Sequence, residues 1–117
     1  MISFPQRVFL YKHDADMRKS FNGLLNIVQS EFQMDVLAGD MFLFIGKRKD
    51  RLKALWWDGD GLAIFLKRLE KGNYQRPLVV SEGCYAVVDR TQLQLMLSGI
   101  ELTSVKQRPR YSRVASK

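Results

Sequence analysis

The sequence predicts a single α+β domain, an antiparallel β-meander with a long N-terminal helix and a short C-terminal helix packed on it. Three observations lead to this expectation. Apolar residues recur at helical spacing between about residues 17 and 32, form strand-length runs from 41 to 76, and return to helical spacing from 93 to 100. The length of 117 residues suits one hydrophobic core and is short for two ordinary domains.

The first predicted elements are a strand and the long helix. Residues 8–12 alternate weakly between apolar and polar side chains, as strands do. Asp14 and Asp16 follow, and we expect them to supply the N-cap of a helix that begins near Met17. The apolar face of this helix consists of Met17, Phe21, Leu24, Leu25, Val28 and Phe32.

The meander is predicted from apolar segments that alternate with turn-forming residues. Residues 41–45 are apolar, the polar segment 46–50 is typical of a hairpin loop, and 52–57 is the return strand. The next four residues are expected to form a tight turn, because Asp-Gly pairs readily adopt positive φ. They are Asp58, Gly59, Asp60 and Gly61.

A further strand over 62–66 is expected to pair back across this turn, and 71–73 has the composition of a third turn. The alternative is a helix over 62–70, because three leucines and one phenylalanine there also fit helical spacing. Unless the outer strand of the meander is covered, it would allow the chain to form homo-oligomers.

The C-terminal part predicts a strand, the short helix and a tail. Residues 86–88 are strand-like, and Asp89 forms a capping box with Gln92 at the start of the helix. After residue 105 the chain is basic and offers little to bury. We therefore expect one domain over 1–105 and a flexible basic tail over 106–117.

Composition excludes several classes of protein. No apolar run approaches the roughly 20 residues that span a bilayer, and Pro5, Gln6 and Arg7 interrupt the region where a signal peptide would be apolar. The single cysteine, Cys84, cannot form an internal disulfide. One cysteine and one histidine also cannot build the usual kind of zinc site. These features are typical of a cytoplasmic protein that contacts no membrane.

Charge indicates a polyanionic partner. The chain has 19 Lys and Arg residues against 12 Asp and Glu residues, a net charge of +7. The segment 106–117 contributes five of these cations and no acid. Basic clusters and tails bind nucleic acid because each neutralised phosphate releases counterions. Charge alone does not separate DNA from RNA, and a solubilising tail is the alternative.

The densest cluster of binding residues lies around the first hairpin, where five cations precede two adjacent tryptophans. Cations beside aromatic faces can hold phosphates while the rings stack on bases. Adjacent tryptophans on a strand point to opposite faces, so only one enters a one-sided core easily. The alternative is a solvated loop above two core tryptophans. The candidate DNA-binding residues are Lys47, Arg48, Lys49, Arg51, Lys53, Trp56, Trp57, Lys67, Arg68, Arg108 and Arg110.

We expect no catalysis, no metal and no cofactor. Asp58 and Asp60 could suggest a metal-dependent nuclease, which needs carboxylates that converge on ions about 4 Å apart. Both lie in the expected Asp-Gly turn, where Asp is favoured by turn geometry, and no third acid follows at a recognisable spacing. No phosphate-binding glycine loop of the Walker or dinucleotide type is present in the sequence.

Four segments together resemble a known family: 16–24, 53–62 with its Trp-Trp-Asp-Gly-Asp-Gly motif, 65–72 and 92–100. The likeness runs from about Val8 to Ile100. On these residues the chain resembles the TnpB accessory proteins of IS66-type bacterial insertion sequences, which are the products of the second reading frame. Arg90 departs from the proline that the family often has at the start of the last helix. The RNA-guided nucleases that share the TnpB label are much longer and carry paired-cysteine zinc motifs.

The resemblance implies a role in transposition beside a separate, larger transposase that carries the catalytic residues. It supplies no catalytic residues for this chain. We expect a nucleoid-associated accessory protein that binds DNA and works with the transposase and another accessory protein of the element. The alternative is an interaction module that docks on the transposase through the tryptophans and the turn Asp58, Gly59, Asp60 and Gly61, without touching DNA.

Overall fold

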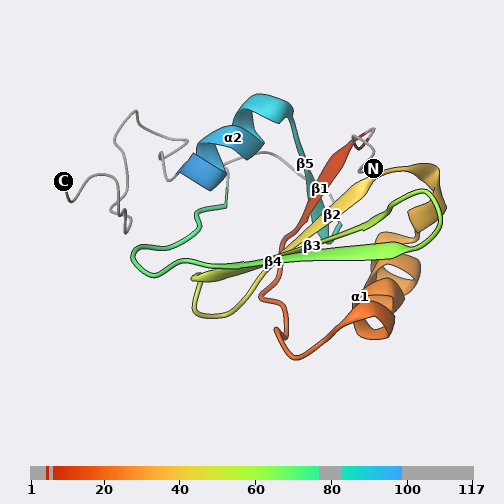
Figure 1. Cartoon of the computed structure of the whole chain (residues 1–117), viewed down its shortest axis with the longest axis horizontal. Helices are drawn as coiled ribbons and strands as arrows, with labels where there is room; N and C mark the ends of the chain where they lie inside the picture. Colours follow the sequence, from red (N-terminus) through yellow and green to blue (C-terminus); the bar gives the residue numbers. More distant parts are fainter. Residues whose placement is uncertain (1–4, 6, 77–82, 99–117) are drawn as a thin grey trace.

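A computed structural model describes residues 5, 7–76 and 83–98 of the chain (Figure 1). Its centre is a five-stranded sheet with the order β4-β3-β2-β1-β5. β1 pairs in parallel with β2, and the other neighbours are antiparallel. The strands are β1 (Val8–Tyr11), β2 (Met41–Ile45), β3 (Arg51–Trp57), β4 (Leu62–Arg68) and β5 (Tyr85–Val88).

Helices cover both faces of the sheet, and Figure 1 shows them on opposite sides. The helix α1 (Phe21–Ile27) continues into a π-helical turn (Val28–Phe32), and a 3-10 turn (Val36–Ala38) precedes β2. α1 and the π-helical turn pack on the face that carries Phe9, Phe42 and Leu55. α2 (Arg90–Ser98) packs on the other face through Met96. Strands β2 and β3 are therefore buried on both faces, which explains their nearly continuous apolar sequence.

The expected layout of this α+β fold is wrong in three respects. The sheet is mixed, because the parallel strand β1 lies between β2 and β5. The described residues contain no long N-terminal helix, since α1 begins at Phe21 and its regular part ends at Ile27. The short C-terminal helix lies on the face of the sheet opposite α1, so the two helices belong to separate cores.

The late start of α1 is explained by the contacts of the residues that precede it. Both aspartates that were expected to cap the helix have other partners. Asp16 accepts hydrogen bonds from the backbone N–H of Arg18 at 2.9 Å and from its guanidinium at 2.9 and 3.0 Å, which closes a turn. Asp14 binds Lys49 and Arg76, and Ala15 forms a bridge with Gly46 beside the sheet. A local turn at Asp16 and the contacts of Asp14 and Ala15 with distant segments thus hold the residues before Ser20 outside the helix.

Several local predictions are confirmed. β2, β3 and β4 form the expected antiparallel meander, and 62–68 is a strand instead of a helix. Asp89 and Gln92 form the predicted capping box, in which each backbone N–H donates to the side chain of the other at 3.0 and 2.7 Å. The tail 106–117, with Arg108 and Arg110, lies outside the described residues. Among the described helices none is long and apolar enough to cross a membrane.

Candidate nucleic-acid interface

Cations gather at one end of the sheet, which we call the basic end. Here β1 and β2 finish, β3 begins at Arg51, and its register partner Arg68 finishes β4. The connecting loops at this end add further cations. Together the basic end has four acids, Asp14, Asp16, Asp50 and Glu70, and a larger number of cations, which are Lys12, Arg18, Lys47, Arg48, Lys49, Arg51, Lys67, Arg68, Lys71 and Arg76.

The opposite end of the sheet, where β2 begins and β3 turns into β4, is acidic. We call it the acidic end. Among the described residues it carries only two cations, Arg7 and Arg90, and Arg7 forms an ion pair with the buried Asp40 at 3.1 Å. Its acids are Asp35, Asp40, Asp58, Asp60 and Asp89. The molecule therefore has an electrostatic polarity along its strands that its net charge does not reveal.

An open pocket of about 560 Å³ lies at the basic end, between the loop after β1 and the β2–β3 hairpin. Its floor is partly apolar, with Ala15 and Met17, and its rim is charged. The charged lining residues are Asp14, Asp16, Arg18, Lys47, Arg48, Asp50 and Arg51. Four of these seven residues are cations, and a concave surface with an excess of cations is suited to a phosphate group or a nucleic-acid backbone.

The hairpin loop that forms one wall of this pocket is a closed turn. Gly46 donates its N–H to the carbonyl of Arg51 at 3.1 Å, and Lys49 donates to the carbonyl of Gly46 at 2.9 Å. Lys49 takes a left-handed conformation with φ of 64°. Gly46 is buried against Met17, and a Cβ atom there would come within 2.7 Å of Met17 Cγ. Glycine at position 46 thus lets the loop after β1 approach the hairpin.

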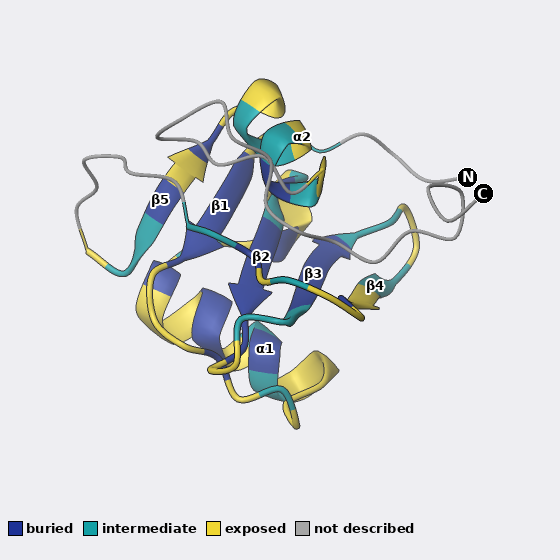
Figure 2. Ribbon diagram, turned by 90° about the vertical axis from the view of Figure 1, so that its left-hand side faces the viewer, coloured by how far each residue is buried: buried dark blue, intermediate teal, exposed yellow. Residues whose placement is uncertain are grey.

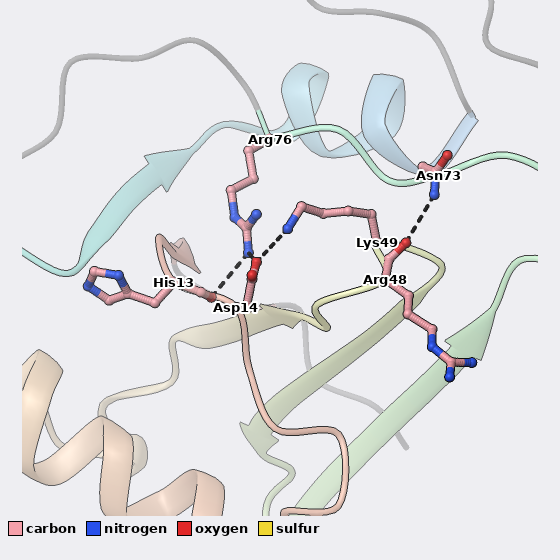
Figure 3. A network of polar contacts seen from close by, with 6 residues as sticks. All are labelled: His13, Asp14, Arg48, Lys49, Asn73 and Arg76. Atoms are coloured by element: carbon pink, nitrogen blue, oxygen red, sulfur yellow. Dashed lines mark hydrogen bonds and ion pairs between the residues drawn. The ribbon is translucent and has the colours of Figure 1, made fainter.

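Polar contacts clamp the loop from both sides, as Figure 3 shows. The Asp14 carboxylate accepts from Lys49 Nζ and, at 3.4 Å, from Arg76 Nη2. The same Arg76 atom donates to the carbonyl of His13 at 3.1 Å, and Asn73 Nδ2 donates to the carbonyl of Arg48 at 3.1 Å. Two segments that are distant in sequence, 13–14 and 73–76, therefore hold the hairpin loop in place.

Two of the three aspartates that line the pocket, Asp14 and Asp16, are held in their charged form. The Lys49 hydrogen bond lowers the pKa of Asp14 below its ordinary value. The hydrogen bonds from the Arg18 side chain and backbone lower the pKa of Asp16 to about 2. Each carboxylate thus already has a cationic partner, and neither is left to repel an incoming anion at full strength.

Three cations of the β2–β3 hairpin form no ion pair with another described residue. They are Lys47, Arg48 and Arg51. Lys47 and Arg48 are exposed, and Figure 3 shows Arg48 pointing away from the Asp14 network. Arg51 is half-buried at the start of β3. These three side chains are the ones best placed to meet a phosphate.

The other candidate cations differ in their surroundings. Lys53 is only 9% exposed, and its Nζ donates to the carbonyl of Lys19 at 2.6 Å. Lys49 forms an ion pair with Asp14. Lys67 is exposed at the end of β4, and Arg68 forms an ion pair with Glu70 at 2.9 Å. The structure thus brings Lys67 and Arg68 to the same end as the hairpin loop but places Lys53 in the interior.

The two tryptophans point to opposite faces of β3, as predicted, and each packs in a core. Trp56 is 8% exposed in the core under α2, and its indole N–H is buried without a hydrogen-bond partner among the described residues. Trp57 is half-buried on the α1 face and donates its indole N–H to the carbonyl of Gly59 at 3.1 Å. The sheet has two cores, so both rings can be buried.

The predicted tight turn is present at the acidic end. Asp58 donates its N–H to the carbonyl of Gly61 at 2.8 Å, and Gly59 has φ of 72°. Asp60 is exposed. The described residues contain no group of three His, Cys, Asp or Glu side chains that could hold a metal ion.

Sequence reasoning missed the residues that shape the pocket. Arg18 and Arg76 belong to the basic end, and Asp14 organises the loop, but none of them lies near 46–53 in the sequence. The Gly46–Met17 contact was also missed. These residues come together only in the folded chain, and no local sequence pattern predicts their contacts.

Comparison with known proteins gives a consistent result. The model of a protein family described as "IS66 Orf2 like protein" matches residues 6–107. Two similar proteins come from Sinorhizobium fredii (strain NBRC 101917 / NGR234), and both are described as uncharacterized. One, y4jC, is 33% identical over 103 residues, which cover 88% of this chain and 86% of the relative. The other, y4hO, is 36% identical over 95 residues, which cover 81% of each chain. No solved structure matches.

Proposed function

Because the chain belongs to the IS66 Orf2-like family of insertion-sequence accessory proteins, we propose that it serves transposition by binding DNA beside a separate transposase. The role that we propose for the chain is non-catalytic. DNA would meet the basic end, with the hairpin loop as the centre of the contact. The observation that carries the proposal is a group of three cations, Lys47, Arg48 and Arg51, which form no ion pair with any described residue. Lys47 and Arg48 lie on the clamped hairpin loop, and Arg51 follows it at the start of β3.

The fixed loop supports binding because little conformational entropy would be lost when phosphate groups are contacted. Lys67 and Arg68 would extend the contact along the same end of the sheet. The acidic end would face away from the DNA, because its aspartates repel phosphate. In this proposal Trp56 and Trp57 support β3 and the turn, and the cations make the contacts.

The proposal is tested by binding of the purified protein to two labelled duplexes, a terminal repeat of the insertion sequence and a scrambled version, across a salt series. We expect log K to fall linearly with log salt concentration. The triple variant Lys47→Ala, Arg48→Ala, Arg51→Ala should reduce the slope by about 0.9 for each phosphate that the variant no longer neutralises. A preference for the terminal repeat would identify recognition of element ends, whereas equal affinities would identify binding by charge alone.

The matched control compares Arg48→Ala with Arg90→Ala. Both remove one arginine charge, but Arg90 lies at the acidic end, at the start of α2. We expect Arg48→Ala to weaken binding and Arg90→Ala to leave the salt slope unchanged. Equal effects of the two substitutions would mean that only net charge matters, and an unchanged slope in the triple variant would remove the hairpin loop from the interface.

Association with the transposase is tested separately by pull-down with and without nuclease. A complex that disappears after nuclease treatment is bridged by DNA, as we propose. A complex that survives nuclease, combined with no affinity for either duplex at near-physiological salt, would replace the DNA-binding proposal with direct docking on the transposase.

A further inference from the structure

The outer edge of β4 is open in the part of the chain that the structure describes. β4 pairs with β3 on one side, and no described strand pairs with its other side. Figure 2 shows it at the margin of the sheet, whereas β1 and β2 are buried inside. Phe65 is 48% exposed and Leu66 is 54% exposed. These are large apolar side chains for an unpaired edge.

Most of this edge lacks the features that usually prevent strands from pairing, because its charged side chains are confined to one end, at Lys67 and Arg68. Edge strands are protected by shortness, by charged side chains, by proline or by a bulge. β4 is seven residues long, and its first five residues are Leu-Ala-Ile-Phe-Leu. The other edge strand, β5, has four residues and a single large exposed apolar side chain, Val87. The two edges therefore differ, and β4 is the one suited to a partner strand.

We propose that β4 pairs antiparallel with β4 of a second copy of this chain, centred on Phe65, so that two sheets join into one. Phe65 is the middle residue of the strand, so this register uses its full length. Leu62 then lies opposite Arg68, Ala63 opposite Lys67, and Ile64 opposite Leu66. A two-fold axis perpendicular to the sheet keeps each face continuous across the interface.

Apolar contacts favour this register. The two Phe65 side chains are direct neighbours on the α2 face, since Phe65 shares its face with Ala54 of β3. Ile64 pairs with Leu55 of β3 and therefore lies on the α1 face. On this face Leu66 of each copy would cover Ile64 of the other. Pairing thus removes from water the two large apolar side chains that β4 exposes.

Charge complementarity favours a second copy of the same chain as the partner, with the two β4 strands antiparallel. The Lys67–Arg68 end of β4 belongs to the basic end, and β4 starts next to the exposed Asp60 of the acidic end. Antiparallel pairing places the cationic end of each strand beside the acidic end of the other. A parallel pair would set cation against cation, which is unfavourable across strands. The chain therefore carries both halves of the complementary surface.

Sedimentation of the wild-type protein and two matched variants tests the proposal. We expect the wild type to be a dimer that dissociates on dilution. Phe65→Lys should shift the protein to monomer, because it places two lysines opposite each other at the centre of the ladder. Val87→Lys, which also replaces an exposed apolar side chain by lysine but on the other edge strand, should remain dimeric. Circular dichroism confirms that each variant is folded.

A cross-link tests the register without adding charge. Opposite residues of an antiparallel pair have Cβ atoms about 4.5–5.5 Å apart, close enough for a disulfide after small adjustment. In a Cys84→Ser background, Phe65→Cys should form a disulfide-linked dimer under mild oxidation, and Val87→Cys should remain a monomer on non-reducing gels. Cys84 is the only cysteine of the chain, so the background contains no competing thiol.

Three outcomes would overturn the proposal. The wild type could sediment as a monomer at every concentration. Val87→Lys could dissociate the dimer while Phe65→Lys does not, which would assign the interface to β5. The transposase could bind the chain, with Phe65→Lys abolishing that complex and no self-association present, which would assign the β4 edge to a different occupant. None of these readouts involves DNA, so they are independent of the proposed function.

Discussion

Lys47 and Lys53 illustrate how two identical side chains, six positions apart, differ in what they can do. Lys47 is exposed on the hairpin loop, whereas Lys53 is buried on β3 with its ammonium group bound to the carbonyl of Lys19. Spacing along the sequence grouped them as one basic cluster. Burial separates them, because a phosphate can reach the first and not the second.

Replacing Lys53 by methionine should change stability and leave DNA binding unchanged. The substitution removes a hydrogen bond from a charged donor, worth about 1.5–3 kcal/mol, and also relieves the cost of burying a charge. We therefore expect the free energy of unfolding to fall by no more than about 2 kcal/mol in urea titrations. The salt slope of DNA binding should match the wild type. A weaker salt dependence of DNA binding in this variant, at unchanged stability, would show that Lys53 contacts DNA.

Tyr11 provides a second prediction at this scale. Burial, followed by its 2.7 Å hydrogen bond to Glu31, raises the pKa of Tyr11 to about 12 from 10.0. Below pH 10 the phenol is neutral in both folded and unfolded chains, so its stabilising contribution is fully present. As the pH rises from 10 to 12 the unfolded chain loses this proton first, and about 3 kcal/mol of stability is lost.

Urea unfolding between neutral pH and pH 12 measures this contribution. The difference in unfolding free energy between wild type and Tyr11→Phe should decrease above pH 10. Tyr85→Phe is the control, because Tyr85 stacks on Phe32 in the same aromatic cluster. A wild-type minus Tyr11→Phe difference that is constant with pH would contradict the assignment.

At the scale of elements, the pocket depends on how closely the loop after β1 approaches the hairpin. That loop does not continue as helix because Asp14, Ala15 and Asp16 make contacts outside it. The helix-spaced apolar residues predicted the position of α1 but not its start. Met17, expected on the helix, instead packs on Gly46 and forms part of the pocket floor.

The Gly46–Met17 contact predicts a double-mutant cycle. Gly46→Ala should lower the free energy of unfolding by about 1–3 kcal/mol, because the new Cβ would lie 2.7 Å from Met17 Cγ. Adding Met17→Ala should recover part of this stability by making space. Gly61→Ala is the control, since nothing lies within 4 Å of a Cβ there. Additive effects of the two substitutions in thermal or urea unfolding would show that the residues do not interact.

At the scale of the whole molecule, polarity is the property that connects the two proposals. In the proposed function the basic end would present the hairpin loop to DNA, and the acidic end of the same copy would face away from it. The same polarity along β4 makes antiparallel self-pairing favourable. A paired assembly would carry two basic ends, one from each copy, at opposite ends of the joined β4 strands.

The sequence by itself determined the elements whose cause is local. The strands of the β2–β3–β4 meander, the Asp58–Gly61 turn and the Asp89–Gln92 capping box follow from short-range periodicity and turn chemistry. The quoted motifs also identified the family. Such features were predictable because neighbouring residues establish them.

Only the tertiary structure decided the insertion of β1 in parallel beside β2, the placement of α1 and α2 on opposite faces, and the late start of α1. It also decided which cations are exposed, which form ion pairs and which are buried. The physical reason is the same in each case. These features depend on contacts between segments far apart in the chain, such as Asp14 with Lys49 and Arg76, and no local pattern encodes such contacts.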